Sequence, residues 1–140
     1  MFKTVLVAAD NSPTAAEAVK AAIELTKMSG GTLHIVTAYK PQQLNATGLE
    51  ELSKSLDSGD LADSLLADLS SRARIGGVPV EVHAETGAPS DAICAVAKRL
   101  DADLVIVGNK GMQGLRRVLG SVPNSVAHQA PCAVLIVSTT

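Results

Sequence analysis

Two kinds of segment alternate along the chain: short apolar runs rich in β-branched residues, and longer stretches with apolar residues at helical spacing. The short runs predict strands, and their nearly continuous apolar character indicates strands that are buried on both faces. The predicted strands are Thr4 to Ala9, Thr32 to Tyr39, Val78 to Ala84, Asp103 to Val107 and Ala133 to Val137.

The longer stretches predict helices, because their apolar residues return every three or four positions. The first helix begins at Pro13, with Ser12 as a candidate N-cap, and ends near Gly30. The remaining predicted helices are Ala62 to Ala73, Pro89 to Leu100 and Ser121 to His128. The polar segment from Pro41 to about Ser58 shows no such spacing and predicts a long irregular loop.

This order of elements predicts an α/β fold. Strands that alternate with helices form a parallel sheet with helices on both faces. We therefore expect a three-layer sandwich with five parallel strands. The sequence contains no internal repeat, low-complexity tract or linker, so residues 1–140 are expected to form one domain.

Composition narrows the range of functions. The chain has a net charge of −2 and only 1% aromatic residues, so it lacks the basic surface and the stacking side chains that nucleic-acid binding requires. Cys94 and Cys132 have no metal-ligand spacing and are expected to be reduced thiols. We expect no membrane association and a cytoplasmic location, since no apolar run reaches the roughly 18 residues of a membrane span and no separate targeting segment precedes the first strand.

The three histidines give no metal signal in the sequence. His34 lies in the second predicted strand, His83 in the third, and His128 in the last helix. No two of them have the spacing of a sequence-local metal motif, which favours structural or surface roles.

The segment after the fourth strand is the strongest candidate for ligand binding. It contains four glycines between Gly108 and Gly120, and Lys110 adds positive charge. Gly120 and Ser121 then open a helix, whose free N–H groups favour an anion. Neither common nucleotide motif is present: the Walker pattern is missing, and Asp10-Asn11-Ser12 stands after strand one where a dinucleotide fingerprint would begin. A glycine run alone is equally consistent with phosphate binding and with a flexible turn.

The chain as a whole resembles the universal stress protein family. The resemblance rests on Asp10 at the end of strand one, the pair Gly108-x-x-Gly111, the pair Gly120-Ser121, and the closing stretch from Ser121 to Val137. It implies a Rossmann-like fold of the adenine nucleotide α-hydrolase type, with strand order 3-2-1-4-5. It also implies the nucleotide-binding branch of the family, which holds ATP.

The resemblance assigns roles to individual positions. Residues expected beside the adenine and ribose are Ala8, Ala9 and Asp10. Residues expected to line the base pocket are Ala38 and Val107. Residues expected around the ribose and phosphates are Gly108, Lys110 and Gly111, and those expected to hold the phosphates at the start of the last helix are Gly120, Ser121 and Val122. Asp10 is also a candidate to contact a Mg²⁺ ion on the phosphates.

The loop between Gly111 and Gly120 is one residue shorter than is usual in that family, because it contains only the eight residues from Met112 to Leu119. Such a loop suits AMP or cyclic AMP as well as ATP. We expect a nucleotide-dependent sensor or regulator in stress responses, with at most slow ATP hydrolysis, since one acid and no evident base stand near the site.

Other functions remain open at this stage. An α-hydrolase enzyme of the same topology would carry a Ser-Gly-Gly phosphate loop after strand one, and a phosphoacceptor receiver would need further acids beside Asp10. A nucleotide-free dimeric scaffold is the third alternative. The last strand, Ala133 to Val137, is expected at a sheet edge, and the resemblance implies a homodimer formed through it.

Overall fold

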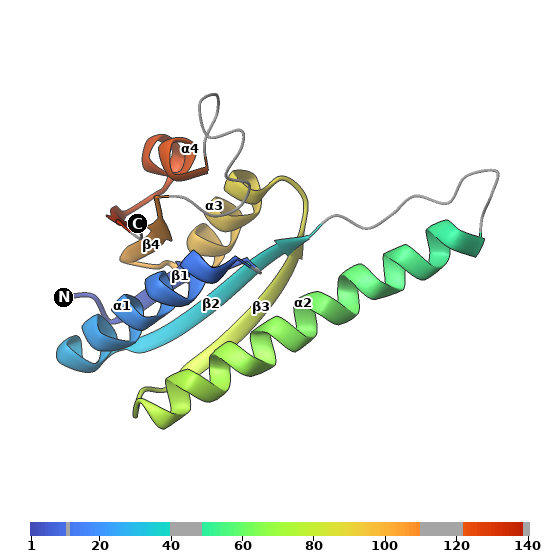
Figure 1. Cartoon of the computed structure of the whole chain (residues 1–140). Helices are drawn as coiled ribbons and strands as arrows, with labels where there is room; N and C mark the ends of the chain where they lie inside the picture. Colours follow the sequence, from blue (N-terminus) through green and yellow to red (C-terminus); the bar gives the residue numbers. More distant parts are fainter. Residues whose placement is uncertain (11, 40–48, 110–121, 139–140) are drawn as a thin grey trace.

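The computed structural model describes residues 1–10, 12–39, 49–109 and 122–138. Over these residues helices and strands alternate as predicted (Figure 1). The elements are β1 (Thr4–Ala8), α1 (Pro13–Ser29), β2 (Thr32–Tyr39), α2 (Leu49–Ile75), β3 (Val80–Thr86), α3 (Pro89–Leu100), β4 (Leu104–Gly108), α4 (Val122–Gln129) and β5 (Ala133–Val137).

The strands form one parallel sheet in the order β3-β2-β1-β4-β5, which confirms the predicted topology. The amino-terminal strand β1 lies at its centre. There Leu6 aligns with His34 of β2 on one side and with Val105 of β4 on the other. β3 and β5 are the two edge strands.

Two apolar clusters, one on each face of the sheet, confirm the three layers. On one face, Val5 and Val7 of β1 pack with α1 and α2; on the other, Leu6 packs with α3 and with Val126 of α4. Figure 1 shows α1 and α2 on the same side of the sheet and α3 and α4 away from them. Adjacent residues of β1 thus contribute to different cores, as expected for a strand buried on both faces.

Both predicted ends of α1 are confirmed. The Ser12 side chain accepts a hydrogen bond from the N–H of Ala15, 3.3 Å away, and so caps the helix. At the other end Gly30 adopts the left-handed conformation, with a φ of 72°, and its N–H donates to the carbonyl oxygen of Thr26.

The predicted loop from Pro41 to Ser58 is wrong over its second part. Residues 40–48 lie outside the described residues, but α2 begins at Leu49 and is 27 residues long. The sequence explains this, because Leu49, Leu52 and Leu56 have helical spacing and no glycine or proline interrupts residues 49–58. In Figure 1 the first turns of α2 extend beyond the tips of β2 and β3. Neither α2 nor any other described helix is long and apolar enough to cross a membrane.

Hydrogen bonds connect the amino-terminal ends of β1, β2 and β4, at the end of the sheet opposite the hollow described below. The carboxylate of Asp103 accepts hydrogen bonds from the N–H groups of Lys3 (2.9 Å) and Thr4 (3.2 Å). The carbonyl oxygen of Lys3 accepts in turn from the N–H of Thr32, 2.8 Å away. Gly31 lies against this backbone, because a Cβ there would be 2.6 Å from the Lys3 carbonyl oxygen.

Candidate functional site

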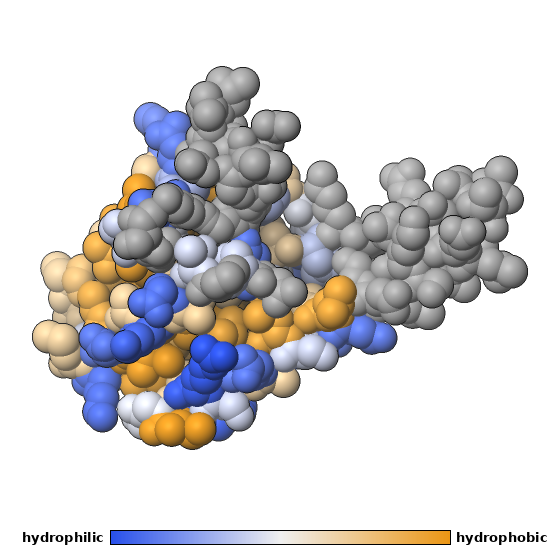
Figure 2. Space-filling model, viewed as in Figure 1, coloured by the Kyte–Doolittle hydropathy of each residue, from blue (hydrophilic) through white to orange (hydrophobic). Residues whose placement is uncertain are grey.

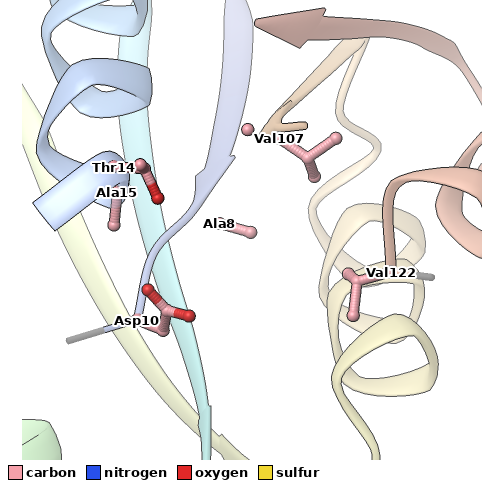
Figure 3. A pocket seen from close by; sticks show the side chains of 7 residues that line it. Ala8, Asp10, Thr14, Ala15, Val107 and Val122 are labelled. Carbon is pink, nitrogen blue, oxygen red and sulfur yellow. The ribbon is translucent and has the colours of Figure 1, made fainter. Parts of the chain in front are cut away.

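A hollow lies between the carboxyl ends of β1 and β4, the two central neighbours in the sheet. After β1 the chain enters α1 on one face of the sheet, whereas after β4 it continues to α4 on the other face. Such a switch point is where parallel α/β sheets bind ligands. Seven described residues line the hollow: Ala8, Asp10, Thr14, Ala15, Val107, Gly108 and Val122 (Figure 3).

The hollow has a polar wall and an apolar wall. In Figure 3 the carboxylate of Asp10 and the hydroxyl of Thr14 lie on the side of β1 and α1. Val107 and Val122 lie across the hollow from them, and Ala8 lies between the two walls. Ala8 and Val107 are almost fully buried, with exposed fractions of 3% and 2%. Their side chains form an apolar surface at the bottom of the hollow.

Asp10 also organises the start of α1. Its Oδ1 accepts a hydrogen bond from the N–H of Ser12 at 2.9 Å, and the Ser12 hydroxyl lies 3.0 Å from that of Thr14. These contacts place the first turn of α1 beside the end of β1. The carboxylate therefore has a structural role whether or not it contacts a ligand.

Two helices begin at the hollow, which favours an anion there. Residues of the first turn of α1 (Thr14 and Ala15) and the first residue of α4 (Val122) are part of its lining. Neither helix has an acidic residue in its first turn. The positive dipole ends of both helices are therefore not offset by first-turn carboxylates, and the Asp10 carboxylate is the acidic group that lies beside the start of α1.

The structure brings together five of the residues predicted from the sequence, Ala8, Asp10, Val107, Gly108 and Val122. Ala9 and Ala38 are not among the lining residues. The described residues do not include the other four predicted ligands, Lys110, Gly111, Gly120 and Ser121. The prediction about the length of the glycine loop also concerns residues outside the described ranges.

Ala9 and Ala38 have other surroundings. Ala9 is 1% exposed in the core beneath α1, and its N–H donates to the carbonyl oxygen of Val36 at 2.9 Å. Ala38 is half-buried near the end of β2, aligned with Glu85 of β3.

Thr14 and Ala15 were missed at the sequence level. The signal was present, because they form the first turn of a helix that directly follows Asp10-Asn11-Ser12 at the end of β1. A helix that starts at a switch point presents its first turn to the ligand as well as the preceding loop.

A sequence profile of the universal stress protein family matches residues 1–138. The chain belongs to this family. The predicted resemblance is therefore confirmed over almost the whole length of this universal stress protein.

Individual relatives and solved structures are consistent with this family assignment. A universal stress protein of Mycobacterium tuberculosis is 36% identical over 144 aligned positions, which cover 99% of this chain and 98% of the relative. A solved structure of a universal stress protein in complex with cAMP is also 36% identical, with a TM-score of 0.78 and coverage of 99% of this chain and 98% of the other. A universal stress protein from Archaeoglobus fulgidus in complex with dAMP is 22% identical, covers 97% of this chain and 98% of its own, and has a TM-score of 0.67. At that identity the likeness shows the fold alone.

The described lining of this universal stress protein combines an apolar surface with the starts of two helices. Asp10 is the one ionisable side chain among the seven described lining residues. General acid–base catalysis at this hollow would thus have to use Asp10 or residues outside the described ranges.

Proposed function

We propose that this chain binds an adenine nucleotide in the hollow between β1 and β4 and acts as a nucleotide-dependent sensor or regulator. One observation carries the proposal: the apolar wall of the hollow and the starts of two helices meet at the switch point of the sheet. The cAMP complex of a relative that is 36% identical supports the same class of ligand.

Each part of a nucleotide has a counterpart in the hollow. The base is placed against the apolar surface that Ala8 and Val107 form side by side on β1 and β4. The ribose lies toward Asp10 and Gly108, and the phosphate lies toward the start of α4 at Val122. The other predicted phosphate ligands, Lys110, Gly111, Gly120 and Ser121, connect β4 to α4 in the sequence and remain part of the proposal.

Titration calorimetry of nucleotide-free protein tests this function. The ligands are cAMP, AMP, ADP and ATP, each with and without Mg²⁺, and cyclic GMP serves as the control for the base. We expect micromolar affinity for at least one adenine nucleotide, which corresponds to roughly 8 kcal/mol of binding free energy. If none of the adenine nucleotides binds, or if cyclic GMP binds equally well, the proposal is wrong. A nucleotide-free scaffold then becomes the better interpretation.

The same titrations decide between ATP and the smaller nucleotides. ATP and Mg²⁺ are the family-based expectation, whereas the one-residue deletion in the loop and the cAMP-bound relative favour a smaller phosphate group. We expect hydrolysis of ATP, where it occurs, to be far slower than the roughly 1–10³ s⁻¹ of ordinary enzymes.

Replacing Asp10 with asparagine separates binding of a metal–phosphate complex from binding of the nucleotide itself. Asparagine keeps an oxygen that can accept from the Ser12 N–H, so α1 should still start correctly, but it removes the negative charge. If Asp10 holds Mg²⁺ on the phosphates, the Mg²⁺-dependent gain in ATP affinity should disappear while cAMP affinity changes less than about threefold. An equal Mg²⁺ effect in both proteins, measured by calorimetry, would remove Asp10 from that role.

We also propose that two chains associate through β5. Among the described residues this strand pairs with β4 on one side and with no strand on the other. Leu135 and Ile136 keep exposed fractions of 38% and 44%, which is high for strand residues of this size. An apolar edge with free backbone groups favours pairing with a second copy.

Replacing Ile136 with lysine should convert such a dimer into a monomer. A lysine on an edge strand opposes edge-to-edge pairing, because association would bury its charge. The matched control is Ile75→Lys at the end of α2, where the isoleucine is 87% exposed and the helix packs on β2 and β3, away from the β5 edge of the sheet. Sedimentation velocity should show a monomer for the first variant and a dimer for the second. A wild-type monomer, or a dimer that Ile136→Lys leaves intact, contradicts the proposed interface.

A further inference from the structure

A cluster of potential metal ligands lies on the edge of the sheet that is remote from β5. The pairing of β2 with β3 aligns His34 with Glu81 and Val36 with His83. Nδ1 of His34 and Nε2 of His83 are 3.0 Å apart, and the two rings are stacked with centroids 5.2 Å apart. One ligand atom from each of His34, Glu81 and His83 lies within 4.8 Å of the others.

The three side chains differ in burial in a way that suits a binding site. His34 is 7% exposed, His83 is half-buried, and Glu81 is exposed. The histidines lie on the face of the sheet that carries α3, because Leu6 and Val36, their partners in the register, belong to the core on that face. The buried imidazole of His34 thus forms the floor of the cluster, and the exposed Glu81 carboxylate lies on its solvent side.

The spacing is close to that of a metal centre. Two nitrogens that ligate one tetrahedral ion at about 2.0–2.1 Å lie about 3.3 Å apart. The 3.0 Å contact between the two ring nitrogens is a hydrogen bond, so a metal ion would replace the shared proton, which moves to the ring's other nitrogen or to water, and the nitrogens would separate by a few tenths of an ångström. The exposed Glu81 carboxylate supplies a third ligand, and water completes the coordination.

The surrounding charges permit a cation. Arg99 of α3 lies near His83, but its guanidinium is paired with the carboxylate of Glu85 at 2.9 Å. Glu81 and Glu85 both place negative charge near His83, and Glu85 also pairs with the nearby cationic Arg99. Burial lowers the pKa of both His34 and His83, which favours the neutral imidazole over the imidazolium.

We propose that His34, His83 and Glu81 bind one divalent transition-metal ion and so link the edge strand β3 to β2. Two imidazoles and a carboxylate favour Zn²⁺, Cu²⁺ or Ni²⁺ over Mg²⁺, which prefers oxygen ligands. The site is separate from the nucleotide hollow, because none of its three side chains is among the described lining residues and its strands, β2 and β3, lie on the side of β1 opposite to β4.

The test uses tag-free, nucleotide-free protein and Zn²⁺ alone as the first probe. Calorimetry and thermal unfolding should show one Zn²⁺ bound per chain and a higher Tm with Zn²⁺ than with a chelator. His83→Gln and Glu81→Gln should each weaken Zn²⁺ binding at least tenfold, since altering even groups that only support a ligand costs that much. Because His34 is buried, these two more exposed ligands carry the test. The matched control is His128→Gln on α4, where the histidine is exposed and outside the cluster, and it should bind Zn²⁺ like the wild type.

A second probe identifies the ligand atoms. The EPR spectrum of bound Cu²⁺ should show coupling to imidazole nitrogens that is reduced in His83→Gln and unchanged in His128→Gln. The proposal is overturned if Zn²⁺ does not bind, or if binding persists in both cluster variants. It is also overturned if binding disappears in a Cys94→Ser or Cys132→Ser variant while the cluster variants keep it.

Discussion

Replacing Val122 with glutamate is expected to weaken adenine-nucleotide binding by at least tenfold. Val122 is the first residue of α4 and lines the hollow, where the phosphate is proposed to lie. A carboxylate there would face an anionic ligand. Two such charges about 6 Å apart repel each other by roughly 3 kcal/mol at an effective dielectric constant of 20, and each 1.4 kcal/mol is about a tenfold change in affinity.

The matched control is Ala127→Glu, which adds the same charge to an exposed position of the same helix, outside the lining of the hollow. We expect it to bind cAMP or AMP within about twofold of the wild type. A glutamate in the first turn of a helix interacts favourably with the helix dipole, which offsets part of the packing that the half-buried Val122 side chain loses, so a thermal unfolding curve should show both variants folded at the temperature of the titration. Equal affinities for the two variants would mean that the phosphate does not approach α4, and the proposed orientation of the nucleotide would be wrong.

The largest expected effect on stability comes from Gly31→Ala. The new Cβ would lie 2.6 Å from the carbonyl oxygen of Lys3 and 2.7 Å from that of Phe2. Both are backbone atoms next to β1, and Lys3 also accepts the hydrogen bond from Thr32, so relief requires the starts of β1 and β2 to separate. We expect the free energy of unfolding to fall by about 1–3 kcal/mol, measured by urea denaturation.

Gly59→Ala is the comparison for that variant. Gly59 lies inside α2, and a Cβ there meets nothing within 4 Å. Alanine should raise the free energy of unfolding by up to about 1 kcal/mol, because it is the better helix former. If both variants lower the stability equally, close packing at Gly31 is not the cause.

The sheet could be predicted almost completely from the sequence. All five strands have the predicted identity, and most boundaries agree within two residues, because each strand is an apolar run between strong breaks such as Ser12-Pro13 and Gly30-Gly31. Their parallel direction follows from the intervening helices. The strand order came from the family resemblance and not from the pattern itself.

The start of α2 and the histidine cluster were harder to predict, for different physical reasons. Residues 49–58 carry many polar residues, which obscured the leucine spacing. His34 and His83 are 49 residues apart, so no local spacing rule could pair them. Their contact follows only from the register of β2 against β3, in which alternate residues of both strands share a face.

At the candidate site, sequence reasoning found the ends of β1 and β4 but not the first turn of α1. Asp10 and Gly108 lie in segments with recognisable motif residues, whereas Thr14 and Ala15 are ordinary helix residues. Their place in the hollow depends on how α1 packs on the sheet. Packing of that kind has no signature in a single sequence.

The pairing of β1 with β4 governs when the chain can fold during synthesis. Lys3 and Asp103, which join these strands at their starts, are separated by 100 residues. β1 is made before the other four strands and thus keeps one edge unpaired until β4 has been made. Such distant partners slow folding and prolong the exposure of an apolar edge. The nascent chain is therefore most prone to aggregation before β4 emerges, and shielding by a chaperone would matter most in that interval.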